Sequence, residues 1–125
     1  MSSPDAEVRK YLADLPGRLR SRLARVVERE AQGLADAIRD AAPADRGTLK
    51  ESVRVERGND RFEKVVEAGG ALTTDDTGYD HALAVEFGTR KMPAEPFFWP
   101  TVREHRDDIA EALQDEVDAV IEESC

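Results

Sequence analysis

The sequence predicts an α+β domain in which a small antiparallel β-sheet packs against a long N-terminal helix and a long C-terminal helix. Apolar residues at steps of three and four predict one helix from Arg18 to Ala41 and another from Val102 to Ile121. Between them, apolar and charged residues alternate as they do in a half-buried strand. A chain of 125 residues has room for one such core. We therefore expect residues 1–15 to form an N-terminal arm or short helix, and residues 16–125 to form a single domain.

The first long helix is predicted to have one apolar face and one charged face. The apolar face is expected to hold Leu19, Leu23, Val26, Val27, Leu34, Ile38 and Ala41. The helix is expected to end before Pro43, because the residue that precedes a proline is disfavoured in helical conformation. In the arm, Ser3 and Pro4 have the residue types of an N-cap and a first helical position, and Pro16 and Gly17 interrupt the pattern.

Residues 52–57 and 62–68 predict the two strands of a β-hairpin. Val53 and Val55 alternate with charged residues, and a glycine-asparagine-aspartate turn follows at 58–60. Residues 44–48 have turn composition, and residues 69–78 are small and polar, so we expect an exposed loop there. A short helix over 79–87 is expected to end at Gly88, which suits the left-handed conformation of a helix C-cap.

Composition excludes several classes of protein. The formal net charge of −9 predicts that the molecule as a whole repels nucleic acid. No stretch approaches the roughly 18 apolar residues of a membrane span, and residues 1–7 lack the pattern of a signal peptide. The single cysteine, Cys125, cannot form a disulfide within the chain, so we expect the protein to be made in a reducing cytosol.

Charge is distributed unevenly along the chain. Five arginines lie between Arg18 and Arg29, whereas residues 99–125 carry nine acidic and two basic residues. Arg18, Arg22, Arg25 and Arg29 can therefore meet an acidic surface, either within one subunit or on a neighbouring one. Alternatively, both charged helix faces are solvated and never meet. The alternative is a small DNA-binding regulator that uses the arginine-rich helix 18–29 to grip phosphates. No second helix follows at helix-turn-helix spacing, which disfavours that alternative.

The sequence contains no recognisable catalytic constellation. Asp80, His81 and Glu86 are the closest approach to a cluster, but five residues separate His81 from Glu86, and that spacing places them on different helical faces. A small metal-dependent hydrolase at this place is a third hypothesis, and bound zinc or manganese would support it. His105 has no second histidine nearby, and no glycine-rich phosphate loop is present. We expect no enzymatic activity, no metal, no cofactor and no small-molecule substrate.

Two features are candidates for an interface between subunits. Phe97, Phe98 and Trp99 stand between two prolines, and we expect at least one of them to be a core residue that anchors the last helix. Trp99→Ala is expected to cost about 3 kcal/mol in folding or assembly. Glu86 can accept hydrogen bonds from the loop 88–90, pair with an arginine, or face solvent at a helix end.

Three motifs, in order, resemble a family of phage tail components named for gene product ten of coliphage HK97. They are the alanine-proline to serine-valine stretch at 42–53, the block from Tyr79 to Thr89 around valine-glutamate-phenylalanine-glycine, and the proline-aromatic block at 96–100. The shared pattern is expected to cover roughly residues 15 to 122, without the N-terminal arm. Asp80 and His81 displace the alanine that the family usually has directly after the tyrosine.

The resemblance implies a structural subunit in the neck or upper tail of a siphophage virion, assembled in the host cytoplasm. Proteins like this join the completed tail to the filled head, or finish the tail tube, and let the genome DNA pass without binding it specifically. Their partners are copies of themselves and the adjacent neck, connector and tube proteins. A sixfold ring is implied because the tail tube has that symmetry. Tail completion protein, tail terminator and head-closure stopper all stay open, as does a gene-transfer particle in place of a phage.

Overall fold

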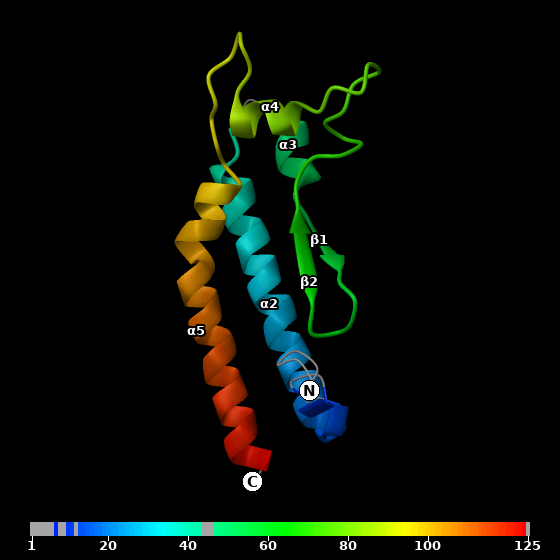
Figure 1. The fold of residues 1–125 in the computed structure, drawn as a ribbon, viewed down its shortest axis with the longest axis vertical. Coiled ribbons are helices and arrows are strands. Elements are labelled where there is room, and N and C mark those ends of the chain that lie inside the picture. The colour runs from blue at the N-terminus through cyan, green and yellow to red at the C-terminus, as the bar shows by residue number, and fades with distance from the viewer. Residues whose placement is uncertain (1–6, 8–9, 12, 44–46, 125) are drawn as a thin grey trace.

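The computed structural model describes residues 7, 10–11, 13–43 and 47–124 of the chain. Its elements follow in the order α2 (Gly17–Ala41), α3 (Gly47–Ser52), β1 (Arg54–Arg57), β2 (Lys64–Glu67), α4 (His81–Phe87) and α5 (Trp99–Ser124). The helices α2 and α5 lie side by side along the long axis of the molecule, and the β1–β2 hairpin lies on the other side of α2 (Figure 1). The short helices α3 and α4 gather at one end. The predicted α+β class is confirmed.

The long helix α2 forms because its apolar residues share one face. Leu19, Leu23, Val26, Ala35 and Ile38 are buried. The residue after the helix, Ala42, has extended backbone with ψ of 140°, the conformation that the following proline favours. Ala41 was expected in the core, but it is exposed, and Ala42 is buried in its place. The reason is geometric, since Ala42 lies four residues after Ile38 and continues the same stripe.

The hairpin is antiparallel, as predicted, with Val55 opposite Val66 and Glu56 opposite Val65. Directly opposed residues project from the same face of a sheet, so Val55 and Val66 lie on one face. Both pack against the core, whereas Val65 is exposed. From the sequence alone, either of the adjacent valines Val65 and Val66 could have been on the buried face of β2. Packing against α2 places Val66 on that face.

The core has two parts, one at each end of α2. Near α3 and α4, the buried cluster includes Ile38, Leu49, Val53, Val85 and Phe97. At the other end, Leu15, Leu19 and Leu23 pack against Val120 of α5. The first cluster fixes α4 and the start of α5 in place, and so it positions the surface described below.

The structure differs from the sequence prediction in the connections. Residues 47–52 form the helix α3, where a turn and the start of a strand were expected. Ser52 is helical because its buried hydroxyl donates to the carbonyl oxygen of Leu49 (2.6 Å) and accepts from the amide of Gly69 (2.9 Å). Helix α5 begins at Trp99, ahead of the expected Val102.

Parts of the prediction lie outside the described residues, namely the N-cap at Ser3 and Pro4, the turn residues 44–46 and Cys125. Of the described residues of the arm, Glu7, Lys10, Tyr11, Ala13 and Asp14 are helical, whereas Leu15 lies in a bend and is buried.

Candidate functional site

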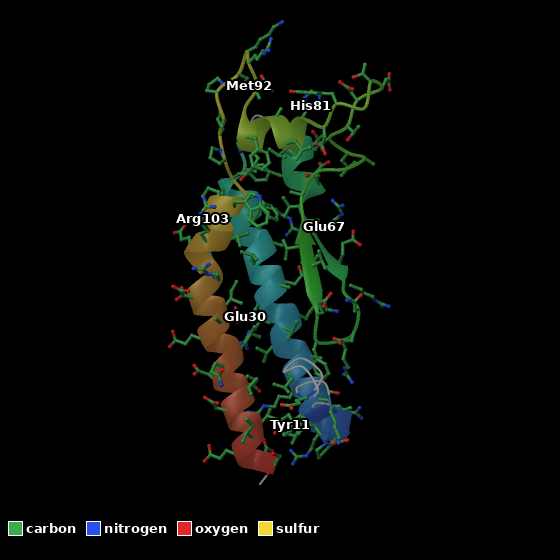
Figure 2. The ribbon with its side chains drawn as sticks, viewed as in Figure 1. Tyr11, Glu30, Glu67, His81, Met92 and Arg103 are labelled. Carbon is green, nitrogen blue, oxygen red and sulfur yellow. The ribbon has the colours of Figure 1, made fainter. Side chains whose placement is uncertain are left out.

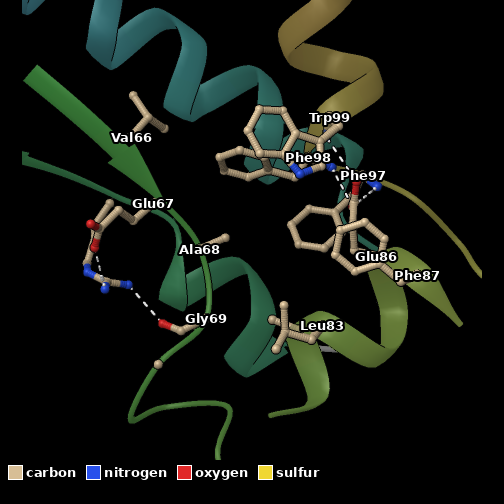
Figure 3. Close-up of a pocket in the computed structure, with 13 residues that line it drawn as sticks. Val66, Glu67, Ala68, Gly69, Leu83, Glu86, Phe87, Phe97, Phe98 and Trp99 are labelled. Carbon is tan, nitrogen blue, oxygen red and sulfur yellow. Dashed lines mark hydrogen bonds and ion pairs between the residues drawn. The ribbon is translucent and has the colours of Figure 1, made fainter. Parts of the chain in front are cut away.

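The carboxylate of Glu86 holds the start of α5. Glu86 is only 7% exposed, and its Oε1 accepts from the amides of Phe97 (2.8 Å) and Phe98 (2.9 Å). Its Oε2 accepts from the amide of Trp99 at 3.0 Å (Figure 3). The first amides of a helix have no partner within the helix, and the helix dipole favours a negative charge there. A distant side chain on α4 therefore supplies the cap that α5 lacks locally.

The sequence prediction for Glu86 was wrong in its choice of partners. Glu86 neither faces solvent nor accepts from the loop 88–90, and it forms no ion pair with an arginine among the described residues. Since α4 ends at Gly88, the chain turns away there, and the segment that returns against Glu86 is 97–99. The buried carboxylate joins α4 to α5.

Helix α4 is itself fixed at both ends. At its start, Asp80 accepts from the amide of Ala82 (2.9 Å) and from the hydroxyl of Thr73 (2.6 Å). Burial raises the pKa of Asp80, but its hydrogen bonds from Thr73, Gly70 and Ala82 outweigh burial and lower the pKa overall. At its end, Gly88 has φ of +77°, and its amide donates to Ala84 at 2.8 Å. The C-cap is at Gly88, as predicted, and its φ is positive, but its ψ of 172° is more extended than in the left-handed helical conformation that was expected.

The three aromatic residues at the start of α5 are buried to different degrees. Phe97 is 2% exposed and belongs to the core, which confirms that at least one of the three anchors the last helix. Phe98 is half-buried, and its ring meets that of Trp99 edge to face, with centroids 5.0 Å apart. Trp99 itself is 49% exposed. The triplet thus runs from the core to the surface within three residues.

Three large apolar side chains lie exposed around this place, and we call them the apolar patch: Leu83, Phe87 and Trp99. Leu83 is 60% exposed and Phe87 66%. They line a pocket of about 350 Å³ (Figure 3). Its other walls come from Arg54 of β1, from residues 66–70, and from Ala82, Glu86, Phe97 and Phe98. Contiguous exposed apolar side chains beside a concavity mark sites of interaction with other molecules.

Sequence reasoning did not single out Leu83 and Phe87, although a signal for them exists. They are four residues apart on α4 and therefore share one helical face. Ala82, Val85 and Glu86 are buried on another face of the same short helix. Since the face with Ala82, Val85 and Glu86 packs into the core, Leu83 and Phe87 are left on the exposed face.

The arginines of α2 have different environments. Arg18 donates to Glu123 (2.6 Å), and Arg22 pairs with both Glu116 and Glu123, all within one subunit. Hydrogen bonding to Glu116 and attraction to both carboxylates raise the pKa of Arg22 against the opposing effect of burial. Arg25 forms no ion pair among the described residues, and Arg29 pairs with its neighbour Glu30 at 3.2 Å. Arg18 and Arg22 therefore meet acidic residues of their own subunit, which is one of the alternatives that the sequence left open.

Asp80, His81 and Glu86, the residues of the hydrolase hypothesis, all make structural contacts. Asp80 and Glu86 are caps of α4 and α5, and the ring of His81 stacks edge to face on Tyr79, with centroids 4.9 Å apart. The Nδ1 of His105 lies 3.0 Å from the carbonyl oxygen of Thr101. Within the described residues, no group of three or more His, Cys, Asp or Glu could hold a metal ion. No helix in this part of the chain has the length and apolar character of a membrane crossing.

Fold and site together define an α+β module whose distinctive surface is an apolar patch fixed in place by buried polar caps. The chain belongs to the family described as "Bacteriophage HK97-gp10, putative tail-component", whose model matches residues 6–88. That match begins inside the arm, contains the first motif and the second up to Gly88, and ends before the third at residues 96–100. It therefore starts earlier than the expected residue 15 and stops well before the expected residue 122. No curated protein and no solved structure matches the chain. A phage tail component is part of the virion.

Proposed function

We propose that this protein is a subunit of a ring at the junction of head and tail, which joins the tail to the head and lets the DNA pass. Membership of the phage tail-component family is the observation that carries the proposal. The apolar patch supports it, since Leu83, Phe87 and Trp99 are 60%, 66% and 49% exposed in the single subunit. A protein that completes its apolar burial only in an assembly has this property.

The cap at Glu86 supports an assembly role for a second reason. A subunit that must fit between two neighbours needs its contact residues at fixed positions before they meet. Glu86 accepts from the backbone amide of Trp99, so it fixes the start of α5 against the helix that carries Leu83 and Phe87. Preorganisation of this kind lowers the entropic cost of association.

The proposal is tested by deleting the gene from the phage that encodes it. Filled heads and separate tails should accumulate, and purified protein added to such an extract should restore joined particles. Particles that form normally without the protein would refute the junction role. Electron microscopy of the particles made with and without the protein also separates the three candidate rings, because loss of a tail terminator gives tails of uncontrolled length.

The second candidate function, a DNA-binding regulator, rests on the arginines of α2 that have no partner on the described part of α5. Its test is a mobility shift with duplex DNA across a range of salt, since phosphate contacts weaken steeply as salt rises. A shift that persists at physiological salt would favour the regulator. We expect none, because the net charge of −9 opposes binding.

A further inference from the structure

A groove between α2 and the hairpin gathers several cations. The groove has a volume of about 520 Å³, and Arg25, Arg57 and Arg61 line it. Two carboxylates also line it, Glu28 and Glu56, and Glu56 pairs with Arg54 at 2.8 Å. All three arginines are exposed, and among the described residues none has a carboxylate partner, since Arg61 donates only to the hydroxyl of Ser21. Lys64, at the same groove, lies 3.6 Å from Glu28. We call the three arginines, from α2, β1 and the turn after it, the arginine groove.

The outer side of α5 carries the opposite charge in a regular pattern. Six acidic residues follow one another at steps of four and three, all of them exposed: Glu104, Asp108, Glu111, Asp115, Asp118 and Glu122. These steps place them on one helical face, and eighteen residues at 1.5 Å each give a row about 27 Å long. Oxygen-tipped side chains are visible along this side of α5 in Figure 2. We call the six residues the acidic stripe.

The acidic stripe has no cation partner within the described part of the subunit. The acidic residues of α5 that do pair with α2 are Glu116 and Glu123, on the inner face. The stripe faces away, because its residues Asp118 and Glu122 are each two positions from Val120, which is buried at 1% exposure. Like charges three or four residues apart destabilise a helix, so a partner that neutralises the stripe would relieve a cost borne by the free subunit.

The two surfaces cannot meet within one molecule. The helix α2 stands between α5 and the hairpin (Figure 1), so the stripe and the groove lie on opposite sides of the subunit. A contact between the groove of one copy and the stripe of the next is therefore head to tail. In an open row of subunits, such a contact leaves one groove and one stripe without a partner at the two ends. Every groove and every stripe has a partner only when the copies close into a ring.

We propose that the arginine groove receives the acidic stripe of a second copy of this chain, and that this contact sets the register of neighbouring subunits. The inference rests on the proposed ring function and names the surfaces that form it. Exposed ion pairs contribute little affinity, and their main effect is on orientation and on the rate of association. The apolar patch provides the affinity, and the charges decide which faces meet.

The structure also decides which arginines can test the idea. Reversing Arg18 or Arg22 would break the contact of α2 with α5 inside the subunit, so a loss of assembly there would be ambiguous. Arg57 and Arg61 form no ion pair among the described residues, and the one side-chain hydrogen bond of Arg61 there, to the hydroxyl of Ser21, is neutral on the acceptor side. Glu111 and Asp115 of the stripe have no cation partner to lose in the described part of the chain. A control matched to the groove variant reverses Arg90 and Lys91, which are exposed in the connection between α4 and α5. It changes the net charge by the same amount and in the same direction as reversal of Arg57 and Arg61.

The experiment compares these proteins for self-association, by light scattering, and for incorporation into particles. R57E/R61E should weaken both at least tenfold relative to R90E/K91E, and E111R/D115R should do the same. The combination of all four substitutions should recover association to within about threefold of the wild type, because it restores opposite charges across the contact with their positions exchanged. Added salt should weaken association of the wild type and narrow the difference from the reversed variants.

Three results would overturn the inference. One is a groove variant no weaker than the R90E/K91E control, and another is a combination that recovers nothing. The third is a duplex DNA shift that R57E/R61E abolishes while self-association stays intact, which would assign the groove to phosphates. If the wild type forms rings and the variants do so equally, only the named surfaces are wrong. If particles join heads to tails without the protein, the ring function itself fails.

Discussion

At the scale of single residues, the first prediction concerns the buried carboxylate of Glu86. Glu86→Ala removes the acceptor of three amides at the start of α5, two of them at 2.8 and 2.9 Å from one carboxylate oxygen. Hydrogen bonds to a charged group are stronger than neutral ones, and a buried donor without a partner is costly. We expect a loss of about 3 kcal/mol in the free energy of unfolding. Denaturant titration followed by circular dichroism measures it.

Glu86→Gln is the graded version of the same test, since the amide keeps one oxygen acceptor and loses the charge. The free energy of unfolding of Glu86→Gln should lie between that of the wild type and that of Glu86→Ala. The exposed Glu95 serves as the control, and Glu95→Ala should leave stability within the scatter of surface substitutions. Equal stability of all these proteins would show that the start of α5 needs no cap.

A second prediction concerns two glycines, Gly88 and Gly33, whose replacement by alanine should change stability in opposite directions. Gly88 has φ of +77°, and a Cβ there would lie 2.9 Å from the amide nitrogen of Ala94. Gly88→Ala should therefore destabilise the fold by about 1–2 kcal/mol. Gly33 lies inside α2, and a Cβ added there would meet nothing within 4 Å, so Gly33→Ala should raise stability by about 0.5–1 kcal/mol. Thermal unfolding of the two variants should shift in opposite directions.

The sequence predicted residue roles well where local geometry decides them and poorly where distant contacts decide them. Gly88 was assigned correctly because a helix followed by glycine is a local signal. The partners of Glu86 were missed because they lie eleven to thirteen residues away, beyond a loop that no local rule describes. The apolar Leu83 and Phe87 escaped notice for a similar reason, since their exposure depends on which face α4 buries.

At the scale of elements, the contact between α2 and α5 should depend on pH. The hydrogen bond from Arg18 lowers the pKa of Glu123, burial opposes it, and attraction to Arg18 and Arg22 adds to it. A carboxyl whose pKa is lowered by folding stabilises the fold above its ordinary pKa, and that contribution is lost as the pH falls through the lowered value. Stability should therefore fall on acidification in the range of carboxyl titration.

Glu123→Gln tests this dependence, because it removes the titrating group and leaves a side chain of similar size. Its melting temperature should fall less between neutral and acid pH than that of the wild type. Glu122 is the matched control, since it neighbours Glu123 in sequence but lies on the outer side of α5 without a cation partner among the described residues. Identical acid profiles for Glu123→Gln and the wild type would mean that the pair adds nothing to the contact between the helices.

The helices were also the elements that the sequence predicted best. Long runs of apolar residues at helical spacing placed α2 and α5 to within one to three residues at each end. The six-residue helix α3 was missed because its glycine and threonine read as a turn, and its helical state depends on the buried hydroxyl of Ser52. Short elements depend on tertiary contacts, which a local pattern cannot contain.

At the scale of the whole molecule, folding and assembly should be separable by mutation, because Phe97 and the apolar patch differ so much in burial. Phe97→Ala empties a site that is 2% exposed, so it should cost about 3–5 kcal/mol of folding stability. Trp99 is 49% exposed and Phe87 66%, so Trp99→Ala and Phe87→Ser should each cost about 1 kcal/mol or less. The cost expected for Trp99→Ala from the sequence would then fall mainly on assembly.

We therefore predict that the Trp99→Ala and Phe87→Ser proteins are folded and monodisperse but fail to complete particles. Unfolding experiments measure the first property, and complementation of the gene deletion measures the second. Because Val65 lies exposed on the outer face of the hairpin, away from the patch, Val65→Ser is the control for loss of an exposed apolar side chain. If the patch variants complete particles as well as Val65→Ser does, the exposed apolar surface is not where the subunit meets its neighbours.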